Sequence, residues 1–113
     1  MAERPTTWSI SDSGTNAALT ATQSGVAGLR HYIVAITVSA SAAPTAPVTA
    51  QLKNGGTVVD QFIIPAGAFA PIMVNYDHPF RCGDGEDAEL TLEALGSGVG
   101  GLIVLKGFTV DGG

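Results

Sequence analysis

The sequence contains few charged residues and no cluster of basic ones. Charged residues make up 13% of the 113-residue chain and apolar residues 45%, whereas a typical soluble domain is about 25% charged. Because phosphate binding depends on grouped Lys and Arg side chains, we expect no nucleic-acid partner. We expect instead that other protein covers part of this weakly charged surface, as in a subunit of an assembly. The net charge is −5, and the basic residues are scattered at Arg4, Arg30, Lys53, Arg81 and Lys106.

Cysteine and long hydrophobic runs are also scarce. The single cysteine, Cys82, excludes an intrachain disulfide and a multi-cysteine metal site. The longest apolar runs, Tyr32–Val38 and Leu102–Leu105, are far shorter than the roughly 20 residues of a membrane-spanning helix. Met1–Pro5 is polar with no apolar stretch behind it, so we expect no secretory signal, no membrane association and synthesis in the cytoplasm. We predict one domain over residues 1–113, with the first five residues as a candidate flexible arm.

No stretch of the chain has the periodicity of a helix. No long window combines an apolar stripe every 3.6 residues with a cap and a stop, and fifteen glycines and six prolines agree with that. Short runs rich in Val, Ile, Thr and aromatic residues alternate with turn-forming residues, which predicts about eight strands. They are Thr6–Ser11, Ala17–Thr22, Leu29–Ser39, Val48–Asn54, Thr57–Ile64, Ala70–Tyr76, Ala88–Ala94 and Gly101–Val110.

The number of strands restricts the architecture. Strands this short and numerous must stack as two sheets or close into a barrel, because one flat sheet would expose an apolar face and two edges. We therefore predict an all-β, jelly-roll-like two-sheet sandwich, with an immunoglobulin-like sandwich or Greek-key barrel as the alternative. Ala40–Pro47 contains two prolines, which predicts an extended crossover between the sheets.

Individual strands differ in how their two faces are divided. Asn54-Gly55 predicts a type I′ hairpin turn between two strands. Ala88–Leu95 alternates Leu and Ala with Glu and Thr, so its Glu face is expected in water. Tyr32–Ser39 and Thr57–Ile64 are apolar on both faces, which predicts that these strands make the subunit contacts. In the first of these, simple alternation places four side chains on one face: Tyr32, Val34, Ile36 and Val38.

The sequence shows no complete catalytic constellation, so we predict a non-enzymatic protein without a cofactor or a metal. Hydrolytic catalysis needs a nucleophile, a base and an orienting group together, and the only histidines are His31 and His78. His31 lies within a predicted strand, where a hydrogen-bonded structural role is the more common one. His78 lies in Tyr76–Phe80, which we interpret as a strand end followed by a turn, where His78 could pair with Asp77.

Two further groups have both a functional and a structural interpretation. Cys82 follows Arg81, whose charge could lower the thiol pKa, but without a base we expect an inert small residue. The segment Asp84–Asp87, with Glu89 just beyond, resembles a calcium loop only loosely, because the EF-hand spacing and terminal Glu are missing. The other interpretation of this segment is a solvated acidic turn.

Two single residues are candidates for contacts. Trp8, the only tryptophan, is expected to pack in the core or at an interface. Arg30 is the basic residue that we would test first at an interface, because its planar guanidinium suits pairing with a carboxylate of a neighbouring chain. An intrachain salt bridge is the alternative.

One segment resembles a known group of proteins. The string Gly-Val-x-Gly-x-Arg-His at 25–31, followed by the apolar strand Tyr32–Ser39 and an Ala/Pro crossover, resembles small β-rich proteins from the structural gene clusters of tailed bacteriophages. Asp77–Cys82 and the acidic loop after it have no counterpart in them. Further similarity covers a hairpin, a linker, a glycine-rich loop and a closing strand, at Gln51–Val59, Pro65–Ala68, Gly96–Gly101 and Gly107–Val110.

The resemblance implies a virion component. The implied protein is a capsid decoration or cement protein of jelly-roll type, which binds the major capsid protein as a homo-oligomer, expected to be a trimer, on the capsid surface. A phage fibre, tail or baseplate module that binds a host glycan is the alternative. The composition agrees with the first role, because a cement protein needs no active site and must hide apolar surface against itself and the shell.

Overall fold

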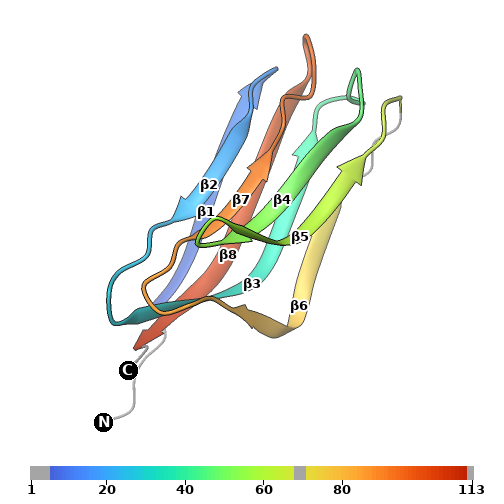
Figure 1. The fold of residues 1–113 in the computed structure, drawn as a ribbon. Coiled ribbons are helices and arrows are strands. Elements are labelled where there is room, and N and C mark those ends of the chain that lie inside the picture. Colours follow the sequence, from blue (N-terminus) through green and yellow to red (C-terminus); the bar gives the residue numbers. More distant parts are fainter. Residues whose placement is uncertain (1–5, 68–70, 112–113) are drawn as a thin grey trace.

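The computed structural model describes residues 6–67 and 71–111. The elements of secondary structure in that part of the chain are all β-strands. Eight strands form two four-stranded antiparallel sheets (Figure 1). We call the sheet with strand order β1-β8-β3-β6 sheet A and the sheet with order β2-β7-β4-β5 sheet B. The strands are β1 (Thr6–Thr15), β2 (Leu19–Gln23), β3 (Leu29–Ala40), β4 (Val48–Asn54), β5 (Thr57–Ile64), β6 (Ile72–Arg81), β7 (Ala88–Leu92) and β8 (Gly100–Asp111).

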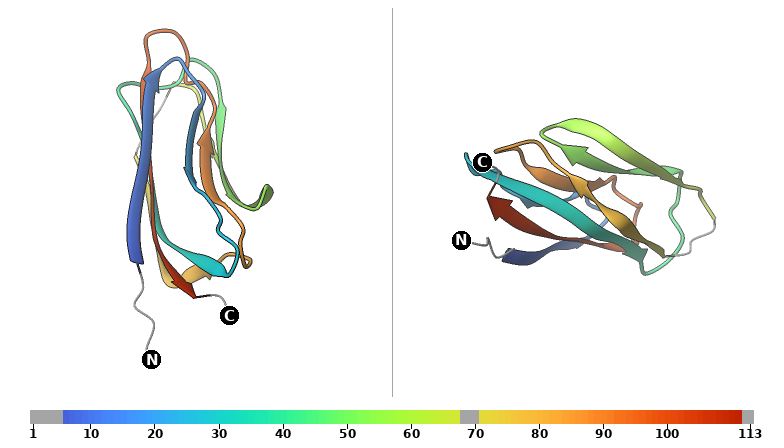
Figure 2. Two further views of the ribbon diagram at one scale, coloured as in Figure 1. Left: turned by 90° about the vertical axis from the view of Figure 1, so that its left-hand side faces the viewer. Right: turned by 90° about the horizontal axis from the view of Figure 1, so that it is seen from below.

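The connections follow the winding of a jelly roll. Each one passes from one sheet to the other except the β4–β5 hairpin, so strands distant in the sequence lie side by side in each sheet (Figure 2). This double-sheet arrangement of eight strands is the jelly-roll topology, and the predicted all-β two-sheet sandwich is confirmed. The predicted crossover over Ala40–Pro47 is the β3–β4 connection, where the Thr45 N–H donates to the carbonyl of Leu95 at 3.0 Å.

The core lies between the sheets and is filled by side chains from alternate positions of the strands, except where a bulge shifts the alternation. In sheet A, Ile36 of β3 pairs with Leu105 of β8, and in sheet B, Leu52 of β4 pairs with Leu90 of β7. All four are at most 1% exposed. Because alternation sends the intervening residues outward, the composition of those positions decides what each sheet presents to its surroundings.

The prediction that Tyr32, Val34, Ile36 and Val38 share one face of β3 is wrong, because the strand contains a bulge. The register between β3 and β8 breaks at Val34, which is an extra residue relative to its partner strand. One extra residue shifts the alternation by one position, so side chains beyond it exchange faces. The apolar residues of β3 that face the core are Ile33, Ile36 and Val38, and His31 faces the same side.

The predicted hairpin is confirmed, with its turn one residue further along the chain. Asn54 pairs with Thr57, so the turn residues are Gly55 and Gly56. Their φ angles of 59° and 90° suit a type I′ turn. The register between β4 and β5 breaks at Val59, and this bulge accounts for the mixed alternation of the second strand.

The edge strand β6 is longer than predicted. The segment that we interpreted as a turn continues the strand, and pairing with β3 resumes at Phe80. Residues 76–79 lie opposite Val34 alone, so the ladder is interrupted there. Pro79 has no N–H to donate, and an edge strand tolerates it.

The other strand limits agree with the prediction within a few residues, apart from β1, which continues four residues beyond the predicted Ser11. The predicted start of β6 at Ala70 and the candidate arm Met1–Pro5 lie outside the described residues. Within the described ranges, no helix is long and apolar enough to cross a membrane.

Candidate interaction surface

The outer face of sheet B is polar on three of its strands and apolar at two positions of the edge strand β5. The outward positions of β2, β7 and β4 hold Thr, Gln, Glu and Lys side chains, as expected for a strand whose Glu face lies in water, whereas β5 exposes Val58 at 43% and Ile63 at 67%. In addition, the exposed Glu93 accepts a hydrogen bond from the Thr49 N–H at 2.6 Å. The rows across β2, β7, β4 and β5 are Thr20, Thr91, Gln51 and Gln61, then Thr22, Glu89, Lys53 and Val58.

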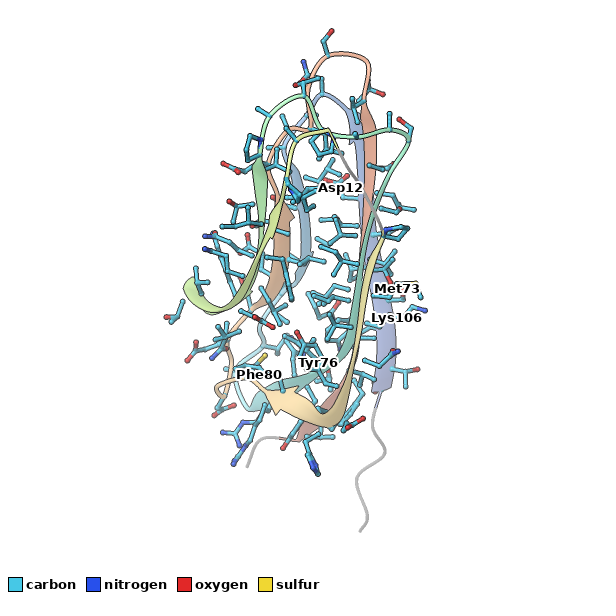
Figure 3. The ribbon with its side chains drawn as sticks, turned by 90° about the vertical axis from the view of Figure 1, so that its right-hand side faces the viewer. Asp12, Met73, Tyr76, Phe80 and Lys106 are labelled. Carbon is cyan, nitrogen blue, oxygen red and sulfur yellow. The ribbon has the colours of Figure 1, made fainter. Side chains whose placement is uncertain are left out.

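The outer face of sheet A consists mainly of hydroxyl-bearing and apolar side chains. Met73 on β6 is 69% exposed and Leu102 on β8 is 41% exposed. Figure 3 shows Met73 and Lys106 pointing away from the sandwich, whereas Tyr76 and Phe80 point into the space between the sheets. The rows across β1, β8, β3 and β6 are Ser13, Leu102 and Ser39; Ser11, Val104, Thr37 and Met73; Ser9, Lys106, Ala35 and Asn75; Thr7, Phe108, Tyr32 and Arg81.

The charges at the paired positions of this face are basic, although the chain is acidic. The described charged side chains there are Arg30, Arg81 and Lys106, and Asp77 lies at the margin, in the interrupted part of β6. The net charge of the whole chain is −5, and the acidic side chains that the structure describes lie in the loops, at the sheet edges and on sheet B. The outer face of sheet A therefore suits a partner surface that is apolar or acidic.

Two aromatic rings on the outer face of sheet A stack on each other. Tyr32 and Phe108 occupy paired positions on β3 and β8, with ring centroids 4.9 Å apart and an angle of 8° between the planes. The ring faces that meet are not available to a ligand. The pair stabilises the junction of the two central strands and does not form a wide flat platform for a sugar.

His31 belongs to a hydrogen-bonded chain inside the sandwich. It is 2% exposed; its Nε2 lies 2.8 Å from the carbonyl oxygen of Ser24 and its Nδ1 lies 2.6 Å from Thr109 Oγ1. The Trp8 Nε1–H donates to the same hydroxyl oxygen at 2.9 Å. A neutral imidazole with its proton on Nε2 satisfies every group, because the carbonyl can only accept and the hydroxyl then donates to Nδ1. This is the structural role expected for His31, and Trp8 packs against the core as expected.

The remaining nucleophile and base candidates are not brought together with His31. His78 is exposed in the interrupted part of β6. Cys82 is 1% exposed, and burial, together with the Glu86 carboxylate, raises the pKa of its thiol to about 11. The nearby Arg81 does not lower that pKa, because Arg81 lies on the outer face of sheet A while Cys82 faces the core.

The acidic loop joins three connections at one end of the sandwich. The Asp87 Oδ1 accepts a hydrogen bond from the Gly25 N–H at 2.6 Å, and the Asp87 carbonyl accepts one from the Gly55 N–H at 3.0 Å. The Glu86 carboxylate lies against Gly55 and Gly83. Among the described residues, no group of three or more His, Cys, Asp or Glu side chains is placed to hold a metal ion. The loop therefore has the geometry of a structural junction.

Two further polar side chains of sheet A are Arg30 on β3 and Tyr76 on β6. Arg30 is half-buried on β3, and its Nε atom is buried without a hydrogen-bond partner in the described part of the chain. On the open side between the edge strands, the Tyr76 hydroxyl of β6 donates to Asp60 Oδ2 of β5 at 3.3 Å. Burial and the Asp60 carboxylate raise the pKa of Tyr76 to about 12, so this hydrogen bond holds the two sheets together over the ordinary pH range.

Sequence reasoning did not identify the hydroxyl row of β1 or the exposed Met73 and Leu102 as parts of one surface. The alternation of Thr7, Ser9, Ser11 and Ser13 with apolar residues was visible in the sequence. Its meaning depends on β1 lying next to β8 in sheet A, which alternation alone does not specify.

No family model matches this chain, and no curated protein does. Among solved structures, the chain is similar to the CBM36-1 domain of a multidomain xylanase from the hindgut metagenome of Trinervitermes trinervoides. The identity is 17% and the TM-score 0.38, over 88% of this chain and 74% of the other. It is also similar to PirA, at 7% identity and a TM-score of 0.45 over 88% and 92% of the two chains. A protein of the disulfide-linked pili that form Bacillus endospore appendages gives 16% identity and a TM-score of 0.44 over 96% and 90%. At these identities the likeness concerns the fold alone.

Proposed function

We propose that this chain is a non-enzymatic structural protein of a tailed-bacteriophage virion, a capsid decoration protein that binds the capsid surface as a homo-oligomer. The observation that carries this proposal is the outer face of sheet A. It exposes Met73 and Leu102, and its charged side chains at the described paired positions are basic in an acidic chain. Exposed apolar side chains on a sheet face are typical of a protein–protein contact. Sheet B also exposes Val58 and Ile63, both on its edge strand β5, so the basic charge is what distinguishes the outer face of sheet A.

The fold supports a role in which the protein resists deformation. The two longest strands, β3 and β8, lie side by side in the middle of sheet A and pair over eleven positions. Their inward side chains fill the core, so the outward side chains stand on a rigid base. A rigid, weakly charged face loses little conformational entropy when it binds a flat partner, and repetition over many copies then strengthens a modest contact.

The experiment compares two apolar residues of nearly equal exposure on opposite faces. Met73 on β6 is 69% exposed and Ile63 on β5 is 67% exposed, each on an edge strand. Capsids that lack the protein are incubated with wild type, Met73→Asp or Ile63→Asp, sedimented, and the bound protein is quantified. We expect the wild type to bind, Met73→Asp to bind about tenfold or more weakly because a carboxylate would be buried without a partner, and Ile63→Asp to bind like the wild type.

Each departure from that pattern has a definite meaning. Wild-type protein that stays in the supernatant contradicts the decoration role, and binding to a glycan array under the same conditions would favour the fibre, tail or baseplate module. Equal loss of binding in both variants would move the contact from the outer face of sheet A to the β5–β6 side, where the sequence predicted a contact through Thr57–Ile64. Thermal unfolding of both variants controls for loss of folding.

A further inference from the structure

The four sheet edges of the sandwich differ in how they are protected against pairing with another strand. Proteins commonly protect edges by shortening the strand, adding a bulge or proline, or placing a charged residue so that it points inward. β2 has only five residues. β5 contains the bulge at Val59 and the inward Asp60, and β6 contains Pro79 and the interrupted ladder. Three of the four edges therefore carry such a feature along their length.

The fourth edge, β1, is protected only in its second half. Its ten residues pair with β8 in unbroken register, and the strand contains neither proline nor lysine. Asp12 blocks the second half: its Oδ1 accepts from the Ser13 N–H at 2.9 Å and its Oδ2 from the Thr20 N–H of β2 at 3.1 Å. The first half, Thr6–Ser11, is uncharged, and Figure 2 (left) shows β1 running along the side of the molecule with its edge open.

The backbone groups that point across this open edge can be assigned. In an antiparallel ladder, successive residues direct their N–H and C=O groups alternately to one side and the other. The Ser13 N–H bonds to the Asp12 side chain, whereas the Asn16 N–H donates to the Val99 carbonyl on the β8 side at 3.0 Å. The backbone groups of the odd-numbered residues therefore face away from β8. Among the residues that the structure describes, the donors and acceptors without a partner in the first half belong to Thr7, Ser9 and Ser11.

We propose that two copies of this chain pair antiparallel through Thr6–Ser11 of β1, about a two-fold axis at Ser9. In this register Ser9 meets Ser9 of the second copy and Thr7 meets the second copy's Ser11, so all three free residues of each strand are paired with free residues. Shifting the register by two residues in one direction brings in the blocked Ser13, and in the other direction leaves Ser11 without a partner among residues 6–15. On the inner side, Trp8 lies beside Ile10 of the second copy, an aromatic and β-branched pair of the kind that stabilises adjacent strands.

This pairing rests on the proposed function, because it needs a lattice that holds the copies together. Six strand residues from each copy are far fewer than the 20–30 of a standard interface. A contact of that size is weak in dilute solution and becomes populated where copies are held close together, as on a capsid lattice. A two-fold contact differs from the trimer that the phage resemblance implies, and the experiment distinguishes the two.

The test uses disulfide trapping of the full chain. Ser9→Cys and Ser13→Cys place a thiol on the same strand and the same exposed face, and the native Cys82 is buried and does not compete. In the proposed register the two Ser9 Cα atoms lie about 5.5 Å apart, which a disulfide can span, whereas the two Ser13 residues are displaced by roughly 27 Å along the strand. We expect Ser9→Cys to form a covalent dimer at least about tenfold faster than Ser13→Cys under the same oxidant.

A second pair of variants measures the unmodified contact. Ser9→Lys sets two like charges opposite each other at the axis, and sedimentation equilibrium should show dimerisation about tenfold or more weaker than in wild type, with Ser13→Lys unchanged. Three results would overturn the pairing. The two cysteine variants form covalent dimers equally fast, neither variant forms one, or the protein is a trimer whose stability Ser9→Lys does not change. Capsid sedimentation is measured separately. Wild-type binding to capsids without Ser9→Cys trapping refutes the pairing alone, and trapping without capsid binding refutes the decoration role alone.

Discussion

Replacing Thr109 with valine removes one hydroxyl group that serves two side chains. In the folded protein that hydroxyl accepts from the Trp8 Nε1–H at 2.9 Å and lies 2.6 Å from Nδ1 of His31. Valine has nearly the same shape, so the substitution leaves the packing in place and deletes both hydrogen bonds. The chain from Trp8 through Thr109 to His31 and the Ser24 carbonyl is thereby cut in its middle.

The loss of folding free energy depends on the burial of each group that loses its hydrogen-bond partner. His31 is 2% exposed, so its Nδ1 loses its partner without access to water, which costs about 1–3 kcal/mol. Trp8 is half-buried and its N–H can be partly rehydrated, which adds about 0.5–1.5 kcal/mol. Together they amount to about 1.5–4.5 kcal/mol, and for a domain of this size the middle of that range corresponds to a fall in Tm of about 10 °C.

The assay is urea unfolding followed by the fluorescence of Trp8, the only tryptophan, and by circular dichroism. Thr109→Ser is the matched control, because it keeps the hydroxyl and removes one methyl group, and it should lose no more than about 1 kcal/mol. We also expect the Trp8 emission maximum to shift in Thr109→Val and not in Thr109→Ser. If Thr109→Val unfolds within about 0.5 kcal/mol of Thr109→Ser, the hydroxyl does not stabilise the fold and the reasoning is wrong.

Three further outcomes follow from particular contacts. A Cβ at Gly107 would collide with a backbone oxygen of β3, so Gly107→Ala should cost about 3 kcal/mol or more, while Gly100→Ala, whose nearest neighbour atom lies at 3.5 Å, should be nearly neutral in the same denaturation assay. The folded pKa of Tyr76 is raised to about 12 from 10, so its stabilisation is complete below about pH 10 and is lost as the pH rises toward 12; Tyr76→Phe should lack this part of the alkaline loss in unfolding curves. The Cys82 thiol, with its pKa raised to about 11, should react with a thiol reagent at about pH 8 only as fast as the protein unfolds. Glu86→Gln should lower that pKa, because it removes the carboxylate that helps to raise it. Rapid labelling of the native protein would contradict the burial of Cys82.

The strand content and the sandwich followed from the sequence because the apolar residues alternate between clear turn signals. The hairpin around Gly55 is a good example, since glycine there has the positive φ that its turn needs. The apolar pattern on both faces of β3 predicted a strand that is central in its sheet or covered on both faces, and the structure places β3 in the middle of sheet A, between β8 and β6. These features depend on residues close together in the sequence.

The features that sequence reasoning missed depend on contacts between distant residues. The bulge at Val34 shifts the alternation of β3, and nothing in the local sequence marks it because the residues on either side are also apolar. The continuation of β6 past Tyr76 was not predicted because Pro79 usually ends a strand, although a sheet edge tolerates it. The candidate surface was missed for the same reason, since its four strands come from the two ends and the middle of the chain.

Pairing at β1 and capsid binding by the outer face of sheet A would be compatible, because they use different parts of the same sheet. A two-fold axis perpendicular to the sheet at Ser9 leaves Thr7, Ser9 and Ser11 of both copies on one side. The two outer faces would then join into a single surface of eight strands, and Met73 of each copy would lie on an outermost strand of that surface. The outer face of sheet B, with Glu89 and its polar neighbours, would point away from the shell. The face with apolar and basic side chains would thus be the one that binds, while the acidic side chains of sheet B would remain in water and discourage further, unspecific association.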